Sequence, residues 1–117
     1  MKPLIALIAT LATTAALASD VEIVTVQAVQ SGTTWRFDVT LRHADTGWEH
    51  YADGWEVLAP DGTSLGLRVL VHPHVNEQPF TRSLGGVMIP DGIPEVTIRA
   101  RDNVDGWTGT PFTLALP

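Results

Sequence analysis

Cysteine is absent from the 117 residues, and lysine occurs once, at Lys2. Without a thiol, the chain cannot form a disulfide, attach a lipid through cysteine or hold zinc on cysteine ligands. Seven basic side chains stand against thirteen acidic ones, so the formal net charge is −6. Proteins that bind nucleic acid by neutralising phosphates need clustered Lys and Arg, and this class is therefore excluded.

The first 18 residues differ from the rest of the chain. Lys2 precedes an uncharged run, Leu4–Leu17, which ends in Ala16-Leu17-Ala18. A short positive start, an apolar stretch and small residues at its end are typical of a secretory signal peptide. The run is too short for a membrane-spanning helix, which needs roughly 20 apolar residues. We therefore predict a signal peptide over residues 1–18 and one periplasmic or secreted domain over residues 19–117, with no membrane anchor after cleavage.

Helical periodicity is missing after residue 18, and apolar residues instead alternate with polar ones. Trp35, Phe37, Val39 and Leu41 alternate with charged or polar neighbours, as in a strand with one buried face. Turn sequences rich in Pro, Asp and Gly separate such segments. The expected strands cover 21–29, 35–42, 55–59, 65–71, 80–89, 96–101 and 112–116. This pattern predicts an all-β fold, a seven-stranded antiparallel immunoglobulin-like β-sandwich.

Two details of these strands follow from the same alternation. Gly85-Gly86 predicts a bulge in the fifth strand. In the fourth strand the apolar residues alternate with Arg68, which places this arginine on the polar face of its sheet. There the strand arginines are expected to pair with cross-strand carboxylates such as Asp38 and Glu56.

The segment Val96–Gly106 resembles the sixth strand and following turn of fibronectin type III and related bacterial sandwich domains. Trp35 stands where those domains carry a core Trp, but their tyrosine corner is missing, because the one tyrosine, Tyr51, lies in a predicted loop. The whole chain is also similar to small exported bacterial proteins of unassigned function. The stretches that carry this second likeness are 43–48, 72–74 and 77–82. The two resemblances imply an immunoglobulin-like fold and export, and no activity.

All four histidines fall in connections that are predicted to share one end of the sandwich. If consecutive strands alternate in direction, connections 42–51, 72–79 and 102–111 lie at one end, which we call the histidine pole. The opposite end receives ordinary Gly, Pro and Asp turns. Functional residues concentrate on loops held by a rigid scaffold, so we expect the function to lie at the histidine pole.

The spacing of the histidines favours metal binding. His72-Pro73-His74 places two imidazoles on one side of an extended chain, and proline stiffens the pair. His43 and His50 flank the neighbouring connection and can approach them. Imidazoles with nearby carboxylates suit Zn²⁺, Cu²⁺ or Ni²⁺. The leading hypothesis is an exported, non-catalytic domain that binds a divalent transition metal, Zn²⁺ or Cu²⁺, through His72 and His74 with His43 or His50.

Two carboxylates at the pole are candidates to accept hydrogen bonds from ligating imidazoles, namely Asp45 and Asp53. Asp53 precedes the core residue Trp55 by two positions, and side chains two apart in a strand point to the same face. Asp53 is therefore expected to point inward unless a bulge at Gly54 shifts the register. It would then need a partner such as Arg82 or a histidine. A structural polar cluster of His43, Asp53 and Arg82 therefore competes with a metal site.

A purely structural role for the histidines is the main alternative. In that interpretation His43 and His50 cap a long loop through hydrogen bonds, whereas His72 and His74 are solvated. Asp102–Gly106 has the look of a calcium loop but lacks the distal bidentate Glu, and we expect an Asx turn there.

Aromatic residues at the same pole suggest a function of another class. Trp48, Tyr51 and Trp107 could form a platform for a protein or glycan ligand, with the histidines structural. Enzymatic activity is not expected, because no Gly-x-Ser-x-Gly elbow is present and a small sandwich offers little room for a deep substrate pocket.

Overall fold

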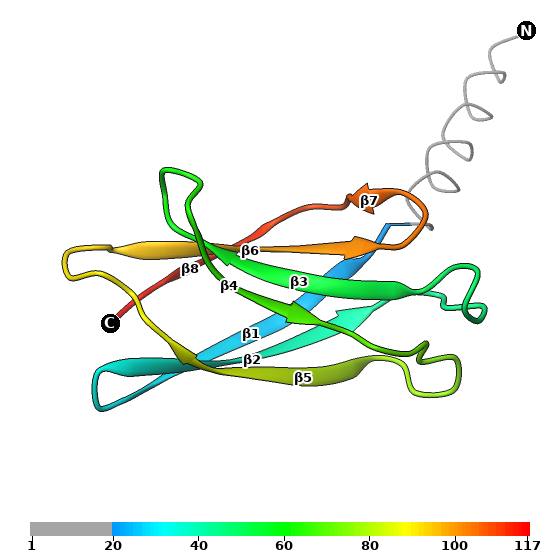
Figure 1. The fold of residues 1–117 in the computed structure, drawn as a ribbon, viewed down its shortest axis with the longest axis horizontal. Helices are drawn as coiled ribbons and strands as arrows, with labels where there is room; N and C mark the ends of the chain where they lie inside the picture. Colours follow the sequence, from blue (N-terminus) through cyan, green and yellow to red (C-terminus); the bar gives the residue numbers. More distant parts are fainter. Residues whose placement is uncertain (1–19) are drawn as a thin grey trace, which may run out of the picture.

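The computed structural model describes residues 20–117, which form two antiparallel sheets packed face to face (Figure 1). The predicted signal peptide, residues 1–18, and Ser19 at the start of the predicted domain lie outside the described residues. The described part contains no helix, and so none long and apolar enough to cross a bilayer. The predicted all-β sandwich is confirmed.

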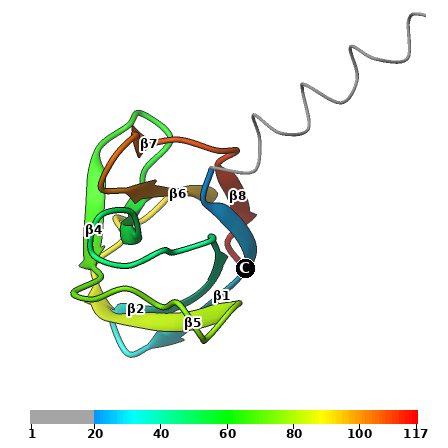
Figure 2. The same cartoon turned by 90° about the vertical axis from the view of Figure 1, so that its right-hand side faces the viewer.

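The smaller sheet has the order β1-β2-β5, and the larger has the order β4-β3-β6-β7 with β8 also paired to β6. The smaller consists of β1 (Glu22–Ser31), β2 (Thr34–Arg42) and β5 (Phe80–Val87). The larger consists of β3 (Ala52–Leu58), β4 (Ser64–Val69), β6 (Glu95–Asp102), β7 (Gly106–Trp107) and β8 (Phe112–Ala115). Figure 2 shows the two layers from the right-hand end of Figure 1.

There are eight strands among the described residues, so the prediction of seven is wrong by one. The additional strand is β7, which pairs back onto β6 through Arg101 opposite Trp107 and Asp102 opposite Gly106. Two residues are too few to show an alternating pattern, and for this reason the sequence gives no sign of this strand.

The core lies between the inward rows of the two sheets. In β2, Trp35, Phe37, Val39 and Leu41 are buried, as their alternation predicts. The facing row of β6 consists of Val96, Ile98, Ala100 and Asp102, all nearly inaccessible to solvent. An acidic residue thus continues the buried row at the end of β6.

The predicted glycine bulge in β5 is confirmed. Trp35 pairs with Val87 but Phe37 pairs with Leu84, so Gly85 and Gly86 together face one residue of β2. Gly86 has φ +67°, a conformation that glycine adopts without steric cost.

A second bulge corrects the expectation for Asp53. Ala52 pairs with Asp102 and Gly54 with Arg101, so Asp53 is the extra residue of β3. Its carboxylate accepts a hydrogen bond from Nε of Arg101 at 2.9 Å. The bulge that the sequence left open at Gly54 is therefore present, Asp53 pairs with Arg101, and the predicted cluster of His43, Asp53 and Arg82 does not form.

The alternation in β4 has the opposite sense from that predicted. Arg68 lies opposite the buried Trp55, whereas Leu67 and Val69 are 49% and 55% exposed. A register shift near Leu58 moves the strand by one residue, and such a slip turns every side chain to the other face. The prediction that Arg68 lies on the polar face is thus wrong.

The predicted cross-strand pairing of arginines with carboxylates holds for Glu56 but not for Asp38. Arg99 Nη2 lies 2.7 Å from a carboxylate oxygen of Glu56, and Asp38 is bound by Arg36 from its own strand.

The predicted histidine pole is present. The connections β2–β3, β4–β5 and β6–β7 all lie at the right-hand end of Figure 1, and the turns β1–β2, β3–β4 and β5–β6 lie at the left. Hydrogen bonds join these three connections, one from His74 N to Asp45 Oδ2 at 2.7 Å and one from Asn103 N to the Tyr51 carbonyl at 3.1 Å. The pole is therefore one continuous structure.

Candidate metal centre

Asp45 is the structural hub of the histidine pole. Its side chain is fully buried just after β2 ends. Oδ1 lies 2.6 Å from Nδ1 of His43 and accepts a hydrogen bond from Ala52 N at 3.0 Å. Oδ2 accepts one from His74 N at 2.7 Å. One carboxylate thus joins the end of β2, the start of β3 and the β4–β5 connection.

The contact with Asp45 fixes the tautomer of His43, whose side chain is 1% exposed. A carboxylate only accepts hydrogen bonds, so Nδ1 carries a proton and donates it to Asp45. Nε2 faces Oδ2 of the buried Asp102 at 3.8 Å. A metal-binding histidine is commonly oriented in this way, by a carboxylate bonded to its other ring nitrogen.

The two carboxylate oxygens of Asp102 differ in their hydrogen bonding. Oδ1 accepts hydrogen bonds from the backbone N of Val104 at 2.9 Å and of Asp105 at 2.6 Å, which confirms the predicted Asx turn. Oδ2 has no hydrogen-bond partner among residues 20–117. The side chain is 0% exposed, so this oxygen also lacks bulk water.

His50 completes the cluster from the β2–β3 connection. A tight turn, closed by His50 N donating to the Gly47 carbonyl at 3.2 Å, aims its ring inward. The ring meets His43 edge to face, with centroids 4.8 Å apart. Its Nε2 lies 3.5 Å from Asp102 Oδ1 and has no hydrogen-bond partner in the described chain.

These three side chains can hold a metal ion. Each offers one ligand atom, and the atoms of His43, His50 and Asp102 all lie within 4.8 Å of one another. Four ligands at 2.0–2.1 Å from a tetrahedral zinc ion are separated by about 3.3 Å, so small side-chain movements suffice to close the site. Imidazole nitrogen and carboxylate oxygen together suit Zn²⁺, Cu²⁺ or Ni²⁺.

The structure does not bring His72 and His74 into this group. The His74 ring stacks on Phe80 with centroids 3.9 Å apart, and its Nε2 lies 2.8 Å from Arg82 Nη2. Arginine only donates, so this nitrogen accepts and its lone pair is occupied. His72 is exposed beside it, with ring centroids 4.6 Å apart. The expectation that His74 is solvated is wrong, since the residue is 5% exposed.

The environment of His74 predicts a loss of stability in acid. Burial, then the charge of Arg82, lowers the pKa of His74 below its ordinary 6.5, although Asp45 and Glu77 act in the opposite direction. The fold thus favours the neutral ring. The resulting stability is fully present above about pH 6.5 and is lost as the pH falls from there towards the lowered folded pKa, with a slope of at most about 1.4 kcal/mol per pH unit.

Urea unfolding of wild type and His74→Gln between pH 7 and pH 5 tests this prediction. Glutamine keeps an acceptor for Arg82 but does not titrate, so the variant should lose less stability over this range. His72→Gln, at the exposed neighbour, should follow the wild type. Equal pH dependence in wild type and His74→Gln would contradict the assignment.

The aromatic residues divide between two places. Trp48, 65% exposed at the tip of the β2–β3 turn, meets Tyr51 edge to face at 5.6 Å. Trp107 lies on β7, where the guanidinium of Arg99 stacks over its ring at 4.1 Å and that of Arg101 at 5.3 Å. The pair Trp48 and Tyr51 is therefore the part of the predicted platform that the structure brings together.

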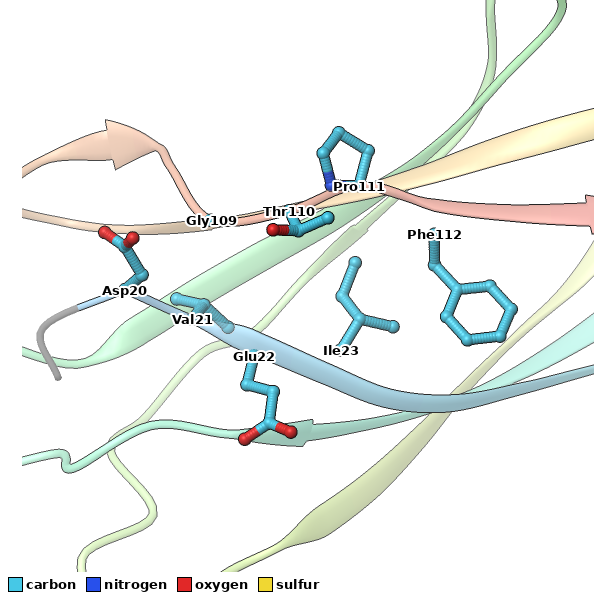
Figure 3. A pocket seen from close by; sticks show the side chains of 8 residues that line it. All are labelled: Asp20, Val21, Glu22, Ile23, Gly109, Thr110, Pro111 and Phe112. Atoms are coloured by element: carbon cyan, nitrogen blue, oxygen red, sulfur yellow. The ribbon is translucent and has the colours of Figure 1, made fainter. Parts of the chain in front are cut away.

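A separate hollow of about 370 Å³ lies between the edges of β1 and β8, and Figure 3 shows Ile23 and Phe112 beside it. Its lining consists of Asp20, Val21, Glu22, Ile23, Gly109, Thr110, Pro111 and Phe112. None of the histidines lines it, so it is distinct from the candidate metal centre.

Sequence reasoning placed Asp102 at the histidine pole but missed it as a ligand. The sequence did contain an indication, because Asp102 continues the every-second-residue series of the core residues Val96, Ile98 and Ala100 and so should point to the same face. An acidic residue at a core-facing position needs a cation or hydrogen-bond donors.

Comparison with known proteins gives one relative. A protein of Halomicrobium mukohataei (strain ATCC 700874 / DSM 12286 / JCM 9738 / NCIMB 13541), described as “Putative lipoprotein”, is 40% identical over 83 residues. The matched segment covers 71% of this chain but 40% of the relative, so this chain corresponds to less than half of that protein. No family model and no solved structure matches the chain.

Proposed function

We propose that this chain is an exported, non-catalytic β-sandwich domain that binds one divalent transition-metal ion, Zn²⁺ or Cu²⁺. His43 Nε2, His50 Nε2 and Asp102 Oδ2 hold the ion, and Asp45 orients His43. His72 and His74 are left out of the ligand set, because Arg82 already occupies Nε2 of His74.

One observation carries the proposal. His50 Nε2 and Asp102 Oδ2 are both buried, converge on the same place, and have no hydrogen-bond partner among the described residues. An unsatisfied buried polar atom costs roughly 1–3 kcal/mol, and a bound cation would remove the cost at both atoms.

Export rests on different evidence. Residues 1–18 have the pattern of a signal peptide, and the relative from Halomicrobium mukohataei is described as a lipoprotein. We infer a periplasmic or secreted domain over residues 19–117.

Calorimetric titration of the purified protein with Zn²⁺ and Cu²⁺ at pH 7 tests metal binding. We expect one ion per chain. His50→Ala should weaken binding by at least about 100-fold, because it removes one of the three proposed ligands. His72→Ala, at the exposed histidine of the other pair, should bind like the wild type. A wild type that takes up neither ion, or a His50→Ala variant of unchanged affinity, would contradict the proposal.

The exposure of Trp48 supports a second candidate function. Asn103 holds its turn rigidly, donating to the Trp48 carbonyl at 3.0 Å and accepting from Tyr51 N at 2.8 Å. A largely exposed tryptophan on a rigid turn suits recognition of a protein or glycan ligand. This function becomes the better supported one if the wild type binds no metal.

A further inference from the structure

Asp105 lies beside His50, one of the three proposed ligands, and on the same short turn as Asp102. Oδ2 of Asp105 is 3.9 Å from Nε2 of His50, a separation similar to those within the proposed ligand set. The turn that carries Asp105 is well defined, because Asp102 Oδ1 accepts hydrogen bonds from its second and third following residues. Gly106, with φ +76°, then returns the chain into β7. One proposed ligand thus fixes the backbone position of Asp105.

The side chains of the cluster differ in solvent exposure, so that one side of it is buried and the other faces solvent. His43 and Asp102 are 1% and 0% exposed, His50 is 27% exposed and Asp105 is 43% exposed. An ion entering from solvent would therefore meet Asp105 and His50 first and settle against His43 and Asp102.

The acidic residues of the histidine pole that lie near His43 and His50 also differ from five others in the chain, which are paired with arginine. Glu22, Asp38, Asp53, Glu56 and Glu77 each form an ion pair with an arginine. Asp45, Asp102 and Asp105 have no arginine partner within residues 20–117, and the side chains they face are the imidazoles of His43 and His50. Three carboxylates beside two imidazoles leave an excess of acidic groups that a dication would balance.

We propose that Asp105 supplies a fourth ligand, so that the ion is held by two imidazole nitrogens and two carboxylate oxygens. This inference rests on the proposed metal-binding function and specifies its ligand set. Four protein ligands around one ion form a closed set of the kind found in structural zinc sites, whereas catalytic sites keep a position for water or substrate. A closed set of four suits Zn²⁺ and agrees with a non-catalytic role.

Competition titration of Zn²⁺ with a chromogenic chelator tests the assignment in the full chain. Asp105→Asn should weaken Zn²⁺ binding by at least about 10-fold, because it replaces a negatively charged ligand by a neutral amide. Asparagine suits the same turn as aspartate, so the backbone should keep its conformation. Asp53→Asn makes the same charge change at an acid that pairs with Arg101, and should alter the affinity less than about two-fold. Circular dichroism of both variants checks that the fold is kept.

The outcomes separate the two proposals. Tight Zn²⁺ binding by the wild type together with unchanged affinity in Asp105→Asn would overturn the fourth ligand and leave the three-ligand site intact. Equal weakening in Asp105→Asn and Asp53→Asn would also overturn it, because the effect would then come from net charge alone. Absence of Zn²⁺ binding in the wild type, with His50→Ala indistinguishable from it, would overturn the metal-binding function itself.

Discussion

Zn²⁺ at a hundred times its dissociation constant should raise the midpoint of thermal unfolding by about 10 to 20 °C. A ligand at this concentration adds about 2.7 kcal/mol to the free energy of unfolding, and 1 kcal/mol moves the midpoint of a small domain by roughly 4–8 °C. Asp102 is far from His43 and His50 in the sequence and meets them only in the folded chain, so the complete set of ligands exists only in the native state.

The position of the cluster gives this stabilisation a structural reason. His43 follows β2 in the smaller sheet, and Asp102 ends β6 in the larger one. An ion bound to both would join the two sheets. Antibody domains connect their second and sixth strands by a disulfide, which a chain without cysteine cannot form.

Circular dichroism during heating, with Zn²⁺ and after its removal by a chelator, measures the shift. His50→Ala should unfold near the temperature of the metal-free wild type whether Zn²⁺ is present or not. An equally large shift in His50→Ala would show that Zn²⁺ acts elsewhere on the protein. The shift should also diminish towards pH 5, because protonated imidazoles cannot coordinate.

Asp45→Ala should lower the free energy of unfolding by about 3 to 5 kcal/mol, even without metal. The change removes the acceptor for the backbone N–H groups of Ala52 and His74, both buried, and for Nδ1 of His43. Since a domain has about 5–15 kcal/mol of stability in total, the variant should be at the margin of folding.

Urea unfolding of the metal-free protein measures this loss. Asp53→Ala is the matched control, because it deletes an acidic side chain at the same pole whose ion pair with Arg101 is partly solvated. Its cost should stay below about 1 kcal/mol. Asp45→Asn keeps one acceptor oxygen and should recover part of the loss. A loss in Asp45→Ala no larger than that in Asp53→Ala would contradict the role of Asp45 as the hub of the pole.

The all-β class and the histidine pole follow from properties of the sequence that are local. In a strand, neighbouring side chains point to opposite faces, so the alternation in Trp35–Leu41 and Val96–Ala100 identifies the buried rows without knowledge of the fold. Strands joined by short turns run antiparallel, and alternating direction alone is enough to place connections 42–51, 72–79 and 102–111 at one end. Neither inference depends on which strands are neighbours in a sheet.

The choice of side chains that meet within the pole was decided by the tertiary structure. The bulge at Asp53 directs this residue to Arg101, and the register shift near Leu58 turns Arg68 towards Trp55. Each depends on an added residue in a pairing, which the alternation does not reveal. His74 is turned away from His43 and His50 by Phe80 and Arg82, and Asp102 is brought to them by the packing of β6 against β2. The approach of His43, which follows β2, to Asp102, which ends β6, joins the two sheets, so this distance arises only when the sheets pack.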